Sequence, residues 1–409
     1  MASETDRPAT IRATLGVGEF RAIWLAEFQS VLGDQLARVA LSVLVFARTG
    51  SAVWPALTYS LTYLPDLFGG TFLSGWADRF PRKAVMVVAD AARAVLLGAM
   101  ALPGVPLPLV AVLLVVAQLF NSPFNAAQAA TLPVALDGEN YVLGQSLRQA
   151  TNQAGQLVGF AVGGLIIALI GPSSGLAVDA VSFGISAVVI GIGVRSRPAP
   201  KVEATEAGTA MRRLAAGARI IWRDDRMRTL VTLAWLAGFV IVPEGLAVPY
   251  AAELGGGATT AGLLLAAHPA GIVIGALFFG RFVRPTVRAK LLGALAIGAI
   301  VPLLGYAWHP PLAITIGLLL LSGFCASYQV TASATFMRLV PDESRGQAFG
   351  LAGSGLIAVQ GIGLVVGGLM VLWLHSAGRT VAVIAAAGLL VALPAAVAWR
   401  RARQADPLS

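Results

Sequence analysis

Long apolar runs recur along the whole chain and are separated by short polar segments. Each run is about 20 residues long or longer, the length that an α-helix needs to cross the hydrocarbon core of a bilayer. The pattern predicts an all-α membrane protein with twelve membrane-spanning helices in two sets of six, at residues 18–46, 52–76, 84–103, 107–130, 145–170, 174–194, 228–252, 258–280, 289–307, 311–336, 345–374 and 379–400.

The longest polar stretch, residues 195–227, separates the two sets. Its first part is rich in Pro, Ala and Glu and is typical of a linker. Residues 211–222 alternate basic and apolar positions at helical spacing, which favours an amphipathic helix on the inner membrane surface. The predicted domains are a six-helix bundle at 1–194, a cytoplasmic linker with an amphipathic helix at 195–227, and a second six-helix bundle at 228–409.

The two predicted bundles contain related sequences. Residues 120–165 align without a gap on residues 324–369, so that Gly159 matches Gly363 and Gln156 matches Gln360. A shared register across two helices and their loop indicates a duplication and two pseudo-symmetric halves. Duplicated halves predict a binding site near the bilayer midplane and alternating access by rocking of one half against the other.

Composition and charge support a membrane location. The chain is 57% hydrophobic and only 12% charged, whereas about 25% of the residues of a soluble protein are charged. With the N-terminus inside, most of the 29 Lys and Arg residues fall at inner loops and helix ends. Positive loops stay cytoplasmic, so we expect a protein of the inner (plasma) membrane with both termini in the cytoplasm. The net charge of +9 is then a topology signal and does not indicate nucleic-acid binding.

A dense group of charges, "GWADRFPRK" at residues 75–83, lies between the second and third predicted helices. The need for cytoplasmic cations explains its basic residues but not the acid Asp78. The segment resembles the signature loop of the major facilitator superfamily, G-x-x-x-D-R-x-x-R-[KR]. The following "VVADAAR" resembles its drug:proton antiporter branch, which includes macrolide-efflux-like and siderophore-exporter-like proteins.

The resemblance implies that the loop acts as a cytoplasmic latch between the two halves. Asp78 would lie near the positive N-terminal end of the helix at 345–374, and the basic residues of the loop can bind lipid phosphates. Asp90 and Arg93 are three residues apart and are placed to pair along one helix face. The alternative is that these charges only fix topology. The predicted latch consists of Gly75, Asp78, Arg79, Arg82, Lys83, Asp90 and Arg93.

Ionisable residues inside spanning helices are costly and are candidates for function. The first helix carries Glu27, Asp34 and Arg38 on one face, and Asp34 and Arg38 are spaced for an ion pair. Glu244 lies between two prolines in the seventh helix. A carboxylate that alternates between a cation and a proton suits a proton-coupled carrier. The candidates for proton coupling are Asp34, Glu244, Glu27 and Arg38; a permanent ion pair or a packing role is the alternative.

Polar side chains at helical spacing on the fourth, fifth and tenth helices could hydrogen-bond a substrate in a central cavity. Hydrogen bonding between helices is the alternative. The candidates are Asn121, Asn125, Gln128, Asn152, Gln156, Tyr328 and Gln329.

Motifs for other chemistry are missing from the sequence. No phosphate-cradling G-x-x-x-x-G-K-[ST] loop occurs, and the three histidines lack metal-ligand spacing. We therefore expect no enzyme activity, no cofactor, no metal ion and no nucleic-acid partner, but a monomer that binds a small-molecule substrate and protons in the lipid bilayer. The first hypothesis is a proton-coupled exporter of small lipophilic or amphiphilic compounds such as a drug, an antibiotic or a siderophore. An uptake symporter or facilitator on the same fold, and a non-transporting receptor or scaffold, are the alternatives.

Overall fold

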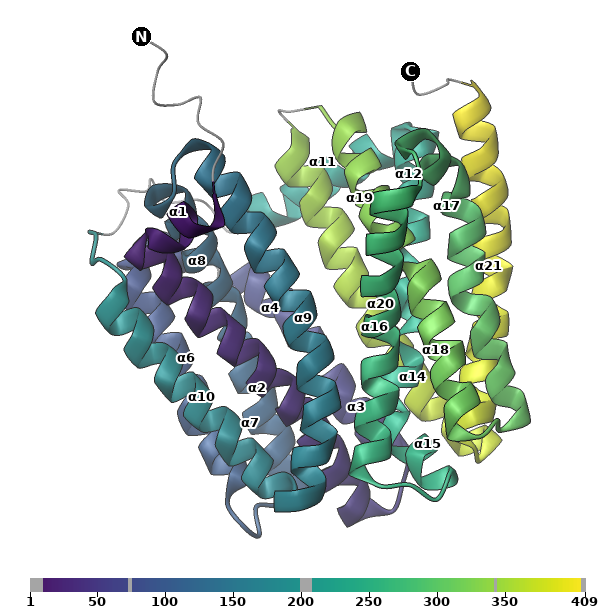
Figure 1. The fold of residues 1–409 in the computed structure, drawn as a ribbon, viewed down its shortest axis with the longest axis horizontal. Coiled ribbons are helices and arrows are strands. Elements are labelled where there is room, and N and C mark those ends of the chain that lie inside the picture. The colour runs from purple at the N-terminus through teal and green to yellow at the C-terminus, as the bar shows by residue number, and fades with distance from the viewer. Residues whose placement is uncertain (1–9, 73–75, 199–207, 342–343, 406–409) are drawn as a thin grey trace. The chain divides into compact units, whose positions relative to one another are not determined.

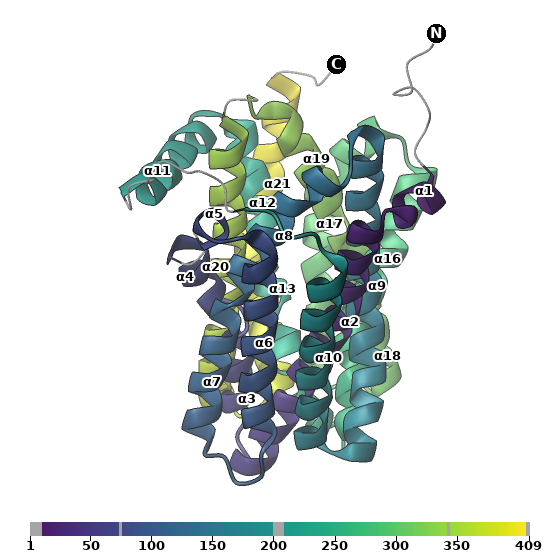
Figure 2. The same ribbon diagram turned by 90° about the vertical axis from the view of Figure 1, so that its left-hand side faces the viewer.

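The computed structural model describes residues 10–72, 76–198, 208–341 and 344–405. These ranges are almost entirely helical and contain no β-strand, so the prediction of an all-α protein is confirmed. The chain divides into two compact units, Met1–Leu44 with Pro65–Ala204 (unit 1) and Val45–Leu64 with Thr205–Ser409 (unit 2). Within each unit the long helices lie side by side (Figures 1 and 2).

Unit 1 contains most of the N-terminal half of the chain. In it, α6 packs along α10, and α7 continues into α8 after a bend at Phe120. Its helices are α1 (Ile11–Gly16), α2 (Gly18–Thr49, of which unit 1 holds the part up to Leu44), α4 (Leu64–Phe72), α5 (Trp76–Arg79), α6 (Arg82–Ala101), α7 (Leu107–Leu119), α8 (Asn121–Ala135), α9 (Gly138–Ile170) and α10 (Pro172–Gly193).

Unit 2 combines the end of α2 and all of α3 with the C-terminal half of the chain. In it, α3 packs on α20, and α16 packs on α18. Its helices after α2 are α3 (Val53–Ser60), α11 (Gly208–Arg223), α12 (Asp225–Trp235), α13 (Ala237–Val240), α14 (Val242–Gly245), α15 (Ala247–Glu253), α16 (Ala258–Phe282), α17 (Pro285–Ile300), the 3₁₀ helix η2 (Val301–Trp308), α18 (Leu312–Ala326), α19 (Tyr328–Leu339), α20 (Arg345–Leu374) and α21 (Ala377–Ala405).

Eleven helical segments of the described ranges are long and apolar enough to cross a membrane. The remaining predicted span, the second in the chain (residues 52–76), is divided into α3 and α4 by a turn at residues 61–63. Pro65 has no amide hydrogen to donate to the carbonyl of Leu61, so a regular helix cannot continue through this point. Twelve spans, one of them broken, fit the two sets of six.

The seventh predicted helix is also irregular. Between Asp225 and Glu253 it consists of four short helices, α12 to α15. Pro243 and Pro249 each remove one backbone donor from this segment. The segment is therefore interrupted beside Glu244, which lies in the four-residue helix α14.

The matched glycines of the two halves allow the same kind of close contact. A Cβ atom on Gly159 of α9 would lie 2.8 Å from the Cβ of Gln35 on α2. A Cβ atom on Gly363 of α20 would collide with the carbonyl oxygen of Gly238 on α13. Only glycine lets these backbones approach so closely, so the duplicated sequence positions also have duplicated packing roles.

Candidate functional site

A buried ion pair connects two helices of unit 1. Arg93 on α6 donates from Nη2 to Oδ1 of Asp34 on α2 at 3.0 Å. The Arg93 side chain is only 7% exposed, and that of Asp34 is 32% exposed. The guanidinium carbon of Arg93 lies 3.8 Å from the centre of the Phe183 ring on α10, so the cation also has an aromatic face as a partner.

Two further carboxylates are buried around this pair. Asp90 Oδ2 accepts a hydrogen bond from Ser186 Oγ at 2.5 Å, and Asp179 Oδ1 accepts one from Ser182 Oγ at 3.1 Å. Asp90 is 1% exposed and Asp179 is fully buried. The second oxygen of each has no hydrogen-bond partner among the described residues. We call Asp34, Asp90, Arg93 and Asp179 the Arg93 cluster.

The Arg93 cluster corrects two expected pairings. The partner of Asp34 is Arg93 of a neighbouring helix, and the expected pair with Arg38 within α2 is not the one that anchors it. Asp90 is bound to Ser186 and makes no ion pair with Arg93 within the described residues. Asp90 and Arg93 therefore lie on one helix, as predicted, but they belong to a buried charge cluster that also includes residues of α2 and α10.

Arg38 and Asp66 extend the charged region. Both Arg38 and Arg93 are close enough to Asp66 on α4 to interact with it electrostatically. Asn121 Nδ2 donates to both Asp66 oxygens, at 3.3 and 3.2 Å. Asn121, a candidate for substrate binding, therefore has an acidic partner within unit 1. Its side chain forms a hydrogen bond between α8 and α4, which was the alternative to substrate binding.

A second charged group connects α2, α8 and α9. Arg148 binds Glu27 through two nitrogens, Nε at 2.5 Å and Nη2 at 2.9 Å. The same Nη2 donates to Oε1 of Gln128 at 2.7 Å, and Gln128 Nε2 donates to Glu27 at 3.3 Å. A two-pronged arginine–carboxylate pair has a fixed geometry. Glu27, Gln128 and Arg148 thus share one ion-pair network.

The remaining polar candidates of unit 1 lie apart from these networks. Asn125 on α8 is exposed. Gln156 Nε2 donates to Asn152 Oδ1 at 2.8 Å along α9, and both side chains are half-buried. These three residues keep polar atoms that a substrate could meet.

Glu244 lies on α14, within the seventh span of the chain. It contacts another helix of unit 2. Its Oε2 accepts a hydrogen bond from Oη of Tyr59 on α3 at 3.0 Å. Tyr59 is 1% exposed. Directly beside this bond, a Cβ atom on Gly245 would lie 3.7 Å from the Cβ of Ala56 on α3. The Tyr59–Glu244 bond therefore holds α3 against α14.

The two candidates on α19 differ in their environment. Tyr328 is buried and donates from Oη to the backbone carbonyl of Leu233 on α12 at 2.6 Å. Its hydroxyl thus serves the contact between two helices. Gln329 is half-buried and remains a candidate for the cavity.

The predicted latch is described only in part. Gly75 lies outside the described residues, as does the side chain of Asp78. Arg79 is exposed. Arg82 donates from Nη1 to the backbone carbonyl of Ala130 on α8 at 2.7 Å, and Lys83 is half-buried beside it on α6.

Asp179 and the serines that bind the buried acids are not among the candidates predicted from the sequence. The signal was readable, because Asp179, Ser182, Phe183 and Ser186 follow helical spacing on one face of α10. Tyr59 carried no comparable signal, since its partner Glu244 is far away in the sequence.

Comparison with known proteins gives the family. The family model described as Major Facilitator Superfamily matches residues 23–247 and 245–408. The multidrug efflux pump Tap of Mycobacterium tuberculosis is 31% identical over 224 residues, which is 51% of this chain and 52% of that protein. The chain therefore spans about half the length of these curated relatives. Tap of Mycolicibacterium fortuitum is 27% identical over 376 residues, 86% of this chain and 88% of that protein. Macrolide efflux protein A of Streptococcus pyogenes is 21% identical over 365 residues, 86% and 89% of the two chains.

Solved structures agree on the fold. A peptide transporter POT in complex with sulfate matches with a TM-score of 0.73 at 14% identity, covering 94% of this chain and 95% of that one. A bacterial homolog of the human lysosomal transporter Spinster matches with a TM-score of 0.70 at 11% identity, covering 94% and 97%. The match of the family model to residues 23–247 and 245–408 confirms the resemblance seen in the loop at residues 75–83, and the chain belongs to the major facilitator superfamily of membrane transporters.

Proposed function

We propose that this transporter exports small lipophilic or amphiphilic compounds in exchange for protons by alternating access. The Arg93 cluster is the observation that carries the proposal. Three aspartates surround one arginine there, and two of them have an oxygen without a hydrogen-bond partner in the described ranges. The printed names of the relatives, a multidrug efflux pump and a macrolide efflux protein, support export as the direction.

Charge balance explains how such a cluster couples to protons. A buried site with more carboxylates than cations is costly unless a carboxylate takes up a proton. Arg93 holds Asp34 at 3.0 Å, while Asp90 lies three residues before it on the same helix. Protonation of Asp34 frees Arg93 to turn toward Asp90. Proton uptake then breaks the ion pair that connects α2 to α6.

Glu244 is the proposed second proton site. As an anion it accepts a charge-assisted hydrogen bond from Tyr59, and such bonds are stronger than neutral ones. A proton on Glu244 weakens this bond and loosens α3 from α14. Since α3 is followed by the turn at residues 61–63, it can move without bending a continuous helix.

Glu27 has a different proposed role. Its two oxygens are held by Arg148, with Gln128 as a further partner. We assign this network to the positioning of α2, α8 and α9. Asn125, Asn152, Gln156 and Gln329 remain the proposed contacts of the substrate. The proposed setting is a monomer in the plasma membrane with both termini in the cytoplasm, which rests on the distribution of Lys and Arg.

Transport by purified protein in liposomes tests the proposal. An imposed pH gradient should drive lipophilic cations, macrolides or siderophores against the direction of proton flow. Asp34→Asn should abolish gradient-driven flux, whereas the matched control Asp137→Asn, at an exposed position of unit 1, should keep it. Glu244→Gln should likewise fail, and its control Glu139→Gln, also exposed, should not.

Each alternative has its own outcome. Movement of substrate in the same direction as protons would replace export with uptake symport. Flux that needs no gradient and ignores both substitutions would make the protein a facilitator. If no compound moves while a labelled compound still binds, the receptor alternative is favoured.

A further inference from the structure

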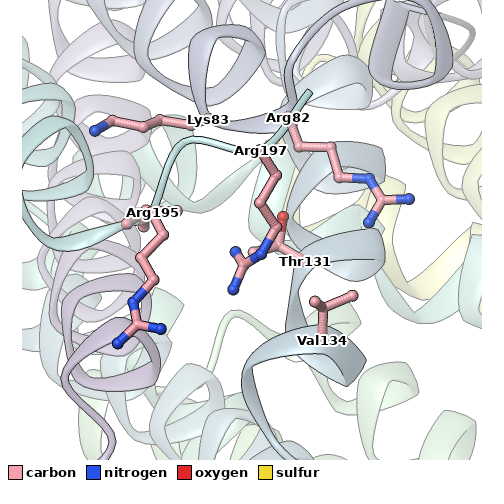
Figure 3. Close-up of a pocket in the computed structure, with 7 residues that line it drawn as sticks. Arg82, Lys83, Thr131, Val134, Arg195 and Arg197 are labelled. Carbon is pink, nitrogen blue, oxygen red and sulfur yellow. The ribbon is translucent and has the colours of Figure 1, made fainter. Parts of the chain in front are cut away.

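A basic pocket lies at one end of unit 1. Four cations from two segments line it, Arg82 and Lys83 at the start of α6, and Arg195 and Arg197 just after α10. Thr131 and Val134 of α8, together with Val194, complete the lining. Figure 3 shows Arg197 between Arg195 and the pair Thr131 and Val134, with Arg82 and Lys83 extending to opposite sides.

The charges of the pocket are only partly balanced. Arg197 binds both oxygens of Glu19 on α2. Arg195 donates its backbone N–H to Oε1 of the same Glu19 at 3.3 Å. Within the ranges that the structure describes, no ion pair joins the side chain of Arg82, Lys83 or Arg195 to a carboxylate. Arg82 uses Nη1 for the Ala130 carbonyl, but its Nε is buried with no hydrogen-bond partner among the described residues. The pocket therefore has a surplus of positive charge and a buried donor that lacks an acceptor.

The chemistry of the pocket lining fits a phosphate group. Arginine and lysine side chains supply the donors that phosphate oxygens accept. In addition, Arg82 and Lys83 are the first residues of α6, where free backbone N–H groups favour an anion.

The helices next to the pocket indicate where the phosphate comes from. Ile192 on α10 is 83% exposed and Val88 on α6 is 58% exposed. Both belong to segments that are long and apolar enough to cross a membrane, so acyl chains of lipids are the natural cover for them. A single amphiphilic ligand could therefore place its headgroup at the pocket and its acyl chains along these apolar side chains.

We propose that this pocket binds the phosphate of an anionic phospholipid, in the cytoplasmic leaflet under the proposed orientation. The ligand would connect the start of α6 to the segment after α10. Such a contact is separate from the proposed proton site in the Arg93 cluster and from the proposed contacts of the substrate.

Native mass spectrometry of the purified protein with added phosphatidylglycerol tests this site. The wild type should retain phosphatidylglycerol in preference to the zwitterionic phosphatidylethanolamine. Removing two charges with Lys83→Gln and Arg195→Gln should weaken the affinity by roughly 30-fold. The matched control is Arg281→Gln with Arg284→Gln, which removes two exposed cations from the corresponding loop of the second half. Arg195→Gln alone, at an exposed position, gives an intermediate loss in a protein whose fold is not at risk.

Three results would overturn the proposal. The first is equal retention of phosphatidylglycerol by the wild type and the double variant. The second is an equal loss in the Arg281/Arg284 control, which would indicate general surface attraction. The third is stabilisation of the wild type by inorganic phosphate, measured as a rise in Tm, without any retained lipid; the site would then belong to free phosphate.

Discussion

Arg93 of α6 binds Asp34 of α2 at 3.0 Å, although Asp90 lies only one helical turn away from it on its own helix. The pair thus connects two helices, and the carboxylate of Asp90 lies on the same helix as the cation. This arrangement has two possible pairings for one arginine, which is what a charge-driven switch requires.

Removal of the cation should damage unit 1 more than removal of the pair. Arg93→Gln leaves several buried carboxylates without a cation, and breaking a buried pair costs about 3–5 kcal/mol; the 32% exposure of Asp34 places this case at the low end. The double variant Asp34→Asn with Arg93→Gln should regain part of the loss. Thermal unfolding in detergent measures both, and equal Tm values for the single and double variants would contradict the pairing.

Glu27 should behave differently from Asp34. Glu27→Gln removes the charge that Arg148 binds and should lower Tm, but gradient-driven transport per folded molecule should remain. Asp34→Asn should show the reverse pattern. Measuring Tm and flux on the same preparations separates the two roles, and loss of gradient-driven flux in Glu27→Gln would return Glu27 to the coupling residues.

The contact between α3 and α14 should be one that opens during transport. If Ala56 and Gly245 are replaced by cysteines, their Cβ atoms lie 3.7 Å apart. This distance is within the roughly 3.5–4.5 Å that disulfides require. In a Cys325→Ser background, which removes the single native cysteine, oxidation should stop transport and reduction should restore it. The single-cysteine variants serve as controls. Full transport by the oxidised protein would mean that α3 and α14 stay together throughout the cycle.

Tyr59→Phe should loosen the same contact without adding a bulky group. A hydrogen bond to a charged group contributes about 1.5–3 kcal/mol, so residues 53–60 should exchange their amide hydrogens faster. The matched control is Tyr141→Phe, at a half-buried position of unit 1. Unchanged exchange in residues 53–60 would assign the stability of α3 to its apolar packing alone.

The close approach of α20 to α13 should not tolerate a side chain. Gly363→Ala would force the added Cβ into the carbonyl of Gly238, and overpacking of this kind typically costs about 1–3 kcal/mol. Gly353→Ala, on the same helix with no atom within 4 Å of its Cβ position, should be neutral or stabilising. A Tm for Gly363→Ala equal to that of the control would show that the two helices can separate at little cost.

The helices and the family were predictable because both depend on local patterns. Apolar length defines the spans, and the loop at residues 75–83 has a fixed spacing of charges. The repeat could also be seen, since matched residues such as Gly159 and Gly363 keep one register.

The pairings were not predictable because they depend on which helices become neighbours. Sequence spacing favoured the pair of Asp34 with Arg38 four residues later, but the spatial neighbour Arg93 is 59 residues away. Tyr59 and Glu244 are 185 residues apart. The break in the second span depended on one missing donor at Pro65, a feature that averaging over a long apolar run conceals.

The buried acids are distributed unequally between the two duplicated halves. From Leu254 to Pro341 and again from Arg345 to Ala405 the sequence contains no Asp or Glu, whereas the Arg93 cluster alone has three. If the cluster and Glu244 couple to protons, the proposed proton sites of the second copy are confined to its first span, and the helices after Leu254 carry none. Those helices are then freer to change shape without loss of the energy source, so new substrate ranges should evolve, and should be easiest to select in the laboratory, through substitutions in them.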